Sequence, residues 1–312
     1  ISFIYLYCFV FLFGLELTGS DWVTGGYKRT AFPLTWDYTQ DFFSWLIIVS
    51  HNNLFGTDSQ VVLACLIHLM LINSAIYMYG SKKNWSLSMV IIFFLPLFFS
   101  NFFLLPSVNG IRQGIATFWV LFAFGAALRG KYLIAGVLFL ISIFSHNTSI
   151  VFAPIFALWF LKDHKTRWIF FVIGSMIYIS IGDFVIQNSG RAWGSDQQNN
   201  LSIQFTLVWI ILFLTQFYFE LINNSKKITG VLKSKAIIGS LYSMIAILPF
   251  YYLPNTYERM AYYTIPITYI LMISTISMRK FSNRTFVTIL LVIPIILYAL
   301  ISYKAITMNF SF

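Results

Sequence analysis

Long, uninterrupted apolar runs are the feature that most constrains how this chain folds. Residues 201–222, for example, read LSIQFTLVWIILFLTQFYFELI and contain a single charged side chain. About 20 predominantly apolar residues in a helix cross the roughly 30 Å hydrocarbon core of a bilayer. Runs of this kind lie near 1–17, 60–80, 87–105, 113–128, 132–146, 148–161, 168–184, 201–222, 236–252, 261–278 and 285–303. We therefore predict about eleven membrane-spanning segments.

The scarcity of charge supports this prediction. The chain is 59% hydrophobic and 10% charged, whereas soluble domains carry about 25% charged residues. In lipid the backbone must satisfy its own hydrogen bonds, which leaves helices or closed barrels, and continuous rather than alternating runs exclude a barrel. We expect an all-α polytopic membrane protein, 1–312 forming one integral membrane domain. No small-residue cleavage site follows 1–17, so we interpret that run as a retained helix.

The distribution of basic residues predicts which loops face the cytoplasm. The net charge of +10 does not indicate nucleic-acid binding, because Lys and Arg stand in short clusters between apolar runs. Fourteen of the twenty basic residues fall in alternate connections, at 82–83, 129–131, 162–167, 226–235 and 279–284. Cationic loops stay in the cytoplasm, so these connections and the N-terminus are predicted to lie inside.

The opposite side then carries the two longest connections, 18–59 and 185–200. Within the first, 39–50 (TQDFFSWLIIVS) is apolar but too short to cross. We expect it to lie as an amphipathic helix at the outer interface. Because long loops often carry function, the chemistry is expected on the outer face.

The common catalytic and metal-binding motifs are absent from the sequence. There is no HExxH, GxxxxGK[ST], GxSxG or GxGxxG. The four histidines are dispersed, and Cys8 and Cys65 lie inside apolar runs, where they serve as small hydrophobic residues. We expect neither a metal nor a cofactor.

Polar residues at the predicted outer ends of apolar runs are the remaining candidates: Arg112, Gln113, His146, Asn147, Tyr257, Glu258 and Arg259. An arginine at a helix N-terminus adds a fixed guanidinium to the backbone N–H groups, which suits a phosphate or diphosphate. The alternative for each arginine is that it extends to lipid headgroups at the membrane surface. His146 could equally be a helix-end residue that caps neighbouring backbone.

One stretch is more specific, 110-GIRQGIATFWVLFAFGAALRGKYLIAGVLFLISIFSHNTSIVFAPIF-156. It places Arg-Gln at the start of one span and Ser-His before another, and it closely resembles the EpsG family, related to the Wzy O-antigen and capsule polymerases. Asp37–Tyr38 and the late Tyr-Glu-Arg extend the resemblance. The resemblance implies an architecture like that of the all-helical lipid-linked glycosyltransferases.

The implied activity is polymerisation of oligosaccharide repeat units carried on undecaprenyl diphosphate, without a metal, on the outer face of the bacterial inner membrane. The family also implies a chain-length regulator and a flippase as functional partners. On this reading Arg112 and Arg259 bind the diphosphate, with Gln113, Tyr257 and Asn147 as further substrate-binding residues. The general base is His146, Asp37 or Glu258.

Three other functions remain open. A flippase for lipid-linked sugars would need a cationic path across the membrane, and the spans contain essentially no basic residues. An acyltransferase would place its Arg and His where a cytoplasmic acyl donor can reach them. A single-sugar transferase with a lipid-linked donor would use an acidic residue in the first outer loop, and Asp21 or Asp37 would fit.

Overall fold

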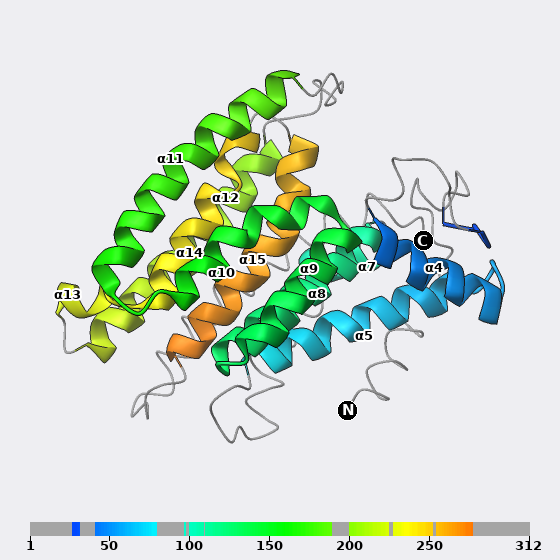
Figure 1. Ribbon diagram of the computed structural model, residues 1–312, viewed down its shortest axis with the longest axis horizontal. Helices are drawn as coiled ribbons and strands as arrows, with labels where there is room; N and C mark the ends of the chain where they lie inside the picture. Colours follow the sequence, from blue (N-terminus) through cyan, green and yellow to red (C-terminus); the bar gives the residue numbers. More distant parts are fainter. Residues whose placement is uncertain are drawn as a thin grey trace. The chain divides into compact units, whose positions relative to one another are not determined.

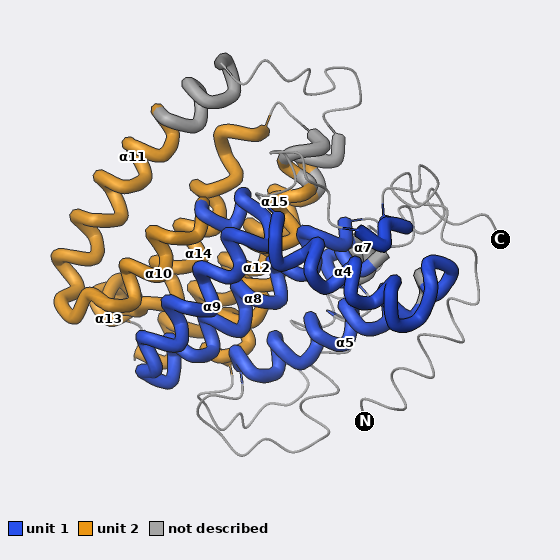
Figure 2. Tube along the Cα trace, turned by 45° about the vertical axis from the view of Figure 1, so that its right-hand side comes forward, with its two compact units in different colours: residues 1–150, 298–312 blue, residues 151–297 orange. Residues whose placement is uncertain are grey.

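A computed structural model describes most of the 312-residue chain. The described residues are 27–31, 41–79, 97, 100–108, 110–188, 200–224, 227–251 and 254–276. Within them every regular element is helical and there is no strand, as the apolar runs predict. The chain divides into two compact units, residues 1–150 with 298–312 and residues 151–297 (Figure 2).

The first unit is built on a helical hairpin and the helices that pack on it (Figure 1). Among its described residues, the helices are α4 (Phe42–Phe55), α5 (Gln60–Tyr79), α7 (Asn101–Val108), α8 (Ile111–Leu128) and α9 (Tyr132–Ser145). Helix α8 is central, since α4, α5, α7 and α9 all contact it. Most of its residues are buried, so α8 forms the core of the unit.

Small residues on α8 permit the close approach of its neighbours. A Cβ at Gly125 would lie 2.5 Å from the ring of Tyr77 on α5, and one at Gly114 would lie 2.5 Å from the carbonyl oxygen of Pro106 on α7. Real Cβ atoms do not reach such distances. These two glycines therefore fix how α5 and α7 seat on α8.

The turn between α8 and α9 is short, so the two helices run antiparallel side by side (Figure 1). Gly130 provides the turn with a positive φ of 73°, a conformation that favours glycine. Arg129 donates from Nη1 to the carbonyl oxygens of Tyr77 at 2.7 Å and Gly125 at 3.0 Å, and its guanidinium lies over the Tyr77 ring. Consequently the start of α8 and the end of α9 lie at the same end of the hairpin.

The second unit is a separate group of helices. It contains α10 (Ala153–Phe160), α11 (His164–Asn188), α12 (Asn200–Asn223), α13 (Ile228–Val231), α14 (Lys235–Ile245), η2 (Leu248–Phe250) and α15 (Pro254–Ile276); the 3₁₀ helix η1 (Asn147–Phe152) precedes α10. Helices α12, α14 and α15 pack on one another. A buried Glu220 accepts a hydrogen bond from Ser234 at 2.6 Å.

The observed helices coincide with most of the predicted spans. Among the described residues, three helical segments are long and apolar enough to cross a membrane, Val62–Tyr79, Ile111–Leu128 and Phe205–Asn223. The predicted span at 148–161 is divided into η1 and α10, and the one at 236–252 into α14 and η2. The predicted spans at 1–17 and 285–303 lie outside the described residues, and of the one at 87–105 only residues 97 and 100–105 are described, the last five of them in α7. The total of about eleven stays a prediction.

The predicted short outer helix at 39–50 is α4, which begins and ends later than expected. Its residues do not follow an apolar-in, polar-out pattern. Ser44, His51 and Asn52 are buried together with Trp45, whereas Phe42 is 46% exposed. The buried polar side chains make specific contacts inside the unit, so α4 is a docked element of the fold; its place at a membrane interface stays a prediction.

Candidate functional site

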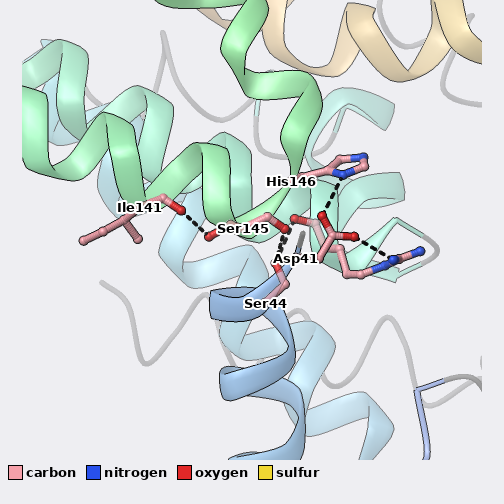
Figure 3. Close-up of polar contacts among 6 residues, drawn as sticks. Asp41, Ser44, Ile141, Ser145 and His146 are labelled. Atoms are coloured by element: carbon pink, nitrogen blue, oxygen red, sulfur yellow. Dashed lines mark hydrogen bonds and ion pairs between the residues drawn. The ribbon is translucent and has the colours of Figure 1, made fainter. Parts of the chain in front are cut away.

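The carboxylate of Asp41 joins two residues that are far apart in the sequence. Its Oδ2 atom accepts a hydrogen bond from Nη1 of Arg112 at 2.7 Å, and its Oδ1 atom lies 3.3 Å from Nδ1 of His146. Figure 3 shows the Asp41 side chain turned toward His146. We call Asp41, Arg112 and His146 the Asp41 cluster.

Three helix ends bring the cluster together. Asp41 is the residue before the first turn of α4, Arg112 lies in the first turn of α8, and His146 follows the last residue of α9. The α8–α9 hairpin places Arg112 and His146 at the same end. Helix α4 contacts both helices of the hairpin and adds the carboxylate between them.

Ser44 holds α4 in this position. Its hydroxyl donates to the carbonyl oxygen of Ser145 at 2.7 Å (Figure 3) and lies 3.3 Å from the carbonyl oxygen of Arg112. Ser44 is fully buried, and buried polar groups that lose their partners are costly. One turn of α4 therefore contacts the end of α9 and the start of α8 at once.

The Asp41 side chain does not cap its own helix. Aspartate is a preferred N-cap residue because its carboxylate accepts from the first N–H groups of a helix. Here Asp41 makes no side-chain cap bond, and only its backbone carbonyl accepts from Trp45. The carboxylate instead contacts Arg112 and His146. It therefore stabilises the packing of α4 against α8 and α9 rather than the first turn of α4.

Burial strengthens the electrostatic interactions within the Asp41 cluster, because water screens them less. The side chain of Asp41 is 7% exposed, that of His146 19% and that of Arg112 32%. A carboxylate only accepts hydrogen bonds, so the Asp41 contact favours the tautomer of His146 with the proton on Nδ1. In neutral His146 the Nε2 atom is then the proton acceptor.

An aromatic ring completes the surroundings of Arg112. Its guanidinium carbon lies 5.7 Å from the centroid of the Trp45 ring, within the range of a cation–π contact. With an ion pair on one side and a ring on another, the guanidinium is held in a defined position. A positioned guanidinium can bind a phosphate through parallel N–H donors.

Other predicted residues of this unit lie beside the cluster in the chain. Gln113 is 4% exposed and belongs to the buried face of α8, where its carbonyl oxygen accepts from Thr117. Asn147 is exposed at the start of η1. Arg112 and His146 are thus the predicted residues that the fold brings to one carboxylate.

The predicted late motif belongs to the second unit. Tyr257 is fully buried and its hydroxyl shares a hydrogen bond with Thr206 at 2.5 Å, and burial raises the pKa of its phenol. Arg259 is exposed. Glu258 lies in α15, and its side chain is outside the described residues. The substrate-binding roles of Tyr257 and Arg259 stay predictions.

The sequence does not predict Asp41 as a site residue; it predicts Asp37, which lies outside the described residues. Both stand in the same predicted outer loop. The signal for Asp41 was its position directly before an apolar segment, which marks a helix start. That signal predicts a helix cap rather than a partner for Arg112, 71 residues later.

In the part of the chain that the structure describes, no group of three His, Cys, Asp or Glu residues could hold a metal ion.

The model of the EpsG family matches residues 1–312, the full length of the sequence. No curated protein and no solved structure matches the chain.

Proposed function

This chain belongs to the EpsG family, and on that premise we propose that it polymerises lipid-linked oligosaccharide repeat units at the outer face of a bacterial inner membrane. The family is one of membrane proteins of polysaccharide biosynthesis, and it implies a lipid-linked oligosaccharide as substrate. The proposal adds the reaction, an undecaprenyl-diphosphate carrier and the residues that act on it.

The observation that carries the proposal is the contact of Asp41 with both Arg112 and His146. A transfer from a diphosphate donor needs positive charge at the leaving group and a base at the attacking hydroxyl. Arg112 can supply the first and His146 the second. Asp41 orients both, in the way that a third group commonly orients a catalytic base.

In the proposed step, a hydroxyl oxygen of one lipid-linked unit bonds to the anomeric carbon of the growing chain. The bond from that carbon to the diphosphate oxygen breaks, and the diphosphate leaves with the electron pair. The hydroxyl proton passes to Nε2 of His146. Hydrogen bonds from the Arg112 guanidinium stabilise the charge that develops on the departing diphosphate.

The distribution of basic loops supports the proposed outward orientation. The connection at 129–131, at the opposite end of the α8–α9 hairpin from the Asp41 cluster, is one of the cationic loops. Cationic loops stay in the cytoplasm. The other end of the hairpin, with the cluster, would then face outward.

The test uses Arg112→Ala in a strain that lacks this protein, with the surface polysaccharide separated on a gel. The matched control is Lys131→Gln, which removes one positive charge at the far end of the same hairpin. Membrane levels of each variant are compared with the parent. We expect the parent and Lys131→Gln to give a ladder of long chains and Arg112→Ala to give carriers with a single repeat unit.

Long chains at the parental level in Arg112→Ala would remove Arg112 from the mechanism. A parent that never restores a ladder would refute polymerisation. Purified protein with a defined donor then distinguishes a single-sugar transferase, which adds one residue and stops. Arg112→Lys keeps the charge but loses the planar fork, and a normal rate in that variant would exclude two-pronged binding of the phosphate.

A further inference from the structure

An open apolar groove runs along one face of α11 in the second unit. Its volume is about 520 Å³. It is lined by Pro154 of α10 and by residues of α11 from Thr166 to Tyr178, among them Ile169, Phe170, Ile173 and Gly174. The α11 residues recur every three or four positions, so they share one face of the helix. Between its first and last lining residues α11 rises about 18 Å, which is more than half of the roughly 30 Å hydrocarbon core of a bilayer.

The groove offers hydrocarbon rather than polar groups to a ligand. At one end, the hydroxyl of Tyr178 donates to the carbonyl oxygen of Ala246 at 2.8 Å. At the other end, the N–H and the hydroxyl of Thr166 both donate to Oδ2 of Asp163, at 2.8 Å and 3.0 Å. The isoleucines and the phenylalanine that line the groove are exposed. A membrane helix presents such residues to lipid, so a hydrocarbon chain is the ligand that fits.

Gly174 leaves open space inside the groove. A Cβ placed at Gly174 would meet no neighbouring atom within 4 Å beyond its own stretch of helix. A larger side chain at this position would therefore fill the groove without displacing a neighbouring helix. Gly136 on α9, in the first unit, is also helical and has the same open space around its Cβ position. It provides a matched control for substitutions at Gly174.

Two basic connections meet at one end of the groove. Nε1 of Trp168 donates to the carbonyl oxygen of Leu232 at 2.7 Å, which joins α11 to the turn after α13. Nη2 of Arg167 donates to the carbonyl oxygen of Lys162 at 2.5 Å, which holds the preceding connection against the same helix. Thr166, the first α11 residue that lines the groove, is the neighbour of Arg167. Both connections therefore lie at the start of α11 (Figure 1).

The charge at this end of the groove is positive. Of the described residues in 162–167 and 227–235, six are basic and one is acidic: Lys162, Lys165, Arg167, Lys227, Lys233 and Lys235 against Asp163. The buried Glu220 adds a second negative charge where it accepts from Ser234, and the excess stays positive. Four of the lysines are exposed, Lys162, Lys165, Lys227 and Lys233. Clustered lysines at the end of a membrane helix attract anionic lipid headgroups.

We propose that the groove on α11 binds one acyl chain of a phospholipid whose anionic headgroup lies at the lysines beside the start of α11. An apolar groove that ends at a cationic surface matches a ligand with a hydrocarbon chain and a negative head. The connections at 162–167 and 226–235 are predicted to be cytoplasmic, and the cytoplasmic leaflet carries anionic lipid. The site is thus separate from the lipid-linked substrate, which the proposed function places at the outer face.

The experiment titrates the full chain in a non-ionic detergent with dioleoylphosphatidylglycerol. A second titration uses dioleoylphosphatidylcholine, which has the same acyl chains and no net charge. Native mass spectrometry counts the lipids bound to each protein. Gly174→Leu fills the groove, and Gly136→Leu is its control. We expect Gly174→Leu to weaken binding of the phosphatidylglycerol on the order of fivefold or more, because contacts with the acyl chain are lost. Gly136→Leu should bind as the parent does.

A pair of lysine substitutions tests the headgroup separately. Lys165→Gln combined with Lys233→Gln removes two positive charges beside the groove. The control, Lys28→Gln combined with Lys131→Gln, removes two from the first unit. We expect the parent to prefer phosphatidylglycerol to phosphatidylcholine on the order of tenfold. The variant with both groove lysines replaced should lose most of this preference, and the control should keep it.

Each other outcome contradicts the inference. Equal losses in Gly174→Leu and Gly136→Leu would show that the groove is not a specific site. Equal binding of the two lipids by the parent would exclude the anionic headgroup. A loss in the lysine pair without a loss in Gly174→Leu would indicate diffuse attraction of lipid to the lysines.

Two other occupants would be recognised in the same experiment. Displacement of the phosphatidylglycerol by a lower concentration of undecaprenyl phosphate would assign the groove to the carrier lipid. Dimers in place of lipid-bound monomers would assign it to a second copy of the chain. Either result would overturn the inference. Thermal unfolding verifies that each variant is folded, and Gly174→Ala, with the smallest side chain, replaces Gly174→Leu if the leucine prevents folding.

Discussion

Replacing Asp41 with asparagine preserves the size of the side chain and removes its charge. Two contacts change: the 2.7 Å bond from Arg112 and the 3.3 Å contact with His146. A hydrogen bond to a charged group is worth about 1.5–3 kcal/mol. The Arg112 side chain is 32% exposed, so water replaces part of this bond and the lower end applies. The His146 contact is long and adds little. We expect Asp41→Asn to lose about 2 kcal/mol of folding free energy.

The effect on activity should be larger than the effect on stability. Without the carboxylate, His146 loses the acceptor that selects its tautomer, and Arg112 loses the partner that orients its guanidinium. Removal of a positioned general base slows a reaction about 10²–10⁴-fold, and we expect a loss in this range for Asp41→Asn. A stability loss of about 2 kcal/mol leaves most of a normally stable protein folded, so unfolding does not account for such a decrease.

The assay is chain extension by purified protein with a defined lipid-linked repeat unit, with the thermal unfolding midpoint measured in the same detergent. The matched control is Asp163→Asn. Asp163 accepts from the backbone N–H of Thr166 at 2.8 Å at the exposed start of α11, and asparagine caps helices about as well as aspartate. A parental extension rate in Asp41→Asn would refute the reasoning. So would an activity loss that matches the fraction of unfolded protein.

Two further predictions concern the packing that assembles the cluster. Gly114→Ala should destabilise the protein by about 1–3 kcal/mol, because the new Cβ would lie 2.5 Å from the backbone carbonyl oxygen of Pro106; thermal unfolding measures this. Gly136→Ala is the control, because Gly136 is in a helix and has open space around the Cβ position; its effect on stability should be neutral or slightly stabilising. Equal losses of stability in Gly114→Ala and Gly136→Ala would contradict the packing described for α8. Ser44→Ala removes the donor to the carbonyl oxygen of Ser145 and should cost about 1–2 kcal/mol. If α4 is held in this way, Ser44→Ala also lowers the extension rate, whereas Ser44→Thr, which keeps the hydroxyl, retains more of it.

Arg112 and His146 could be identified from the sequence because each stands where an apolar run begins or ends. Headgroup contacts and helix capping also place polar residues at such boundaries, so the position marks a candidate and does not assign its role. The boundaries themselves were also predictable, since α5, α8, α9 and α12 follow apolar runs of nearly the same extent. Helix ends and apolar runs are local features of the chain, so patterns of neighbouring residues are sufficient to predict them.

Asp41 could not be identified in the same way. It stands before an apolar segment that begins a helix, and by itself that pattern predicts a helix cap. Its partners are 71 and 105 residues away, and no periodicity or composition relates positions at such separations.

The amino-acid sequence is sufficient to identify a helical membrane protein of the EpsG family, with an arginine and a histidine at helix ends. This is possible because hydropathy, basic loops and short motifs are local patterns of residues along the chain. The folded chain shows which carboxylate contacts both of them, Asp41, and which aromatic ring lies against the arginine, Trp45. Those choices depend on how α4 docks on the α8–α9 hairpin through Ser44, and docking is set by the shapes and hydrogen bonds of surfaces that only the folded chain creates.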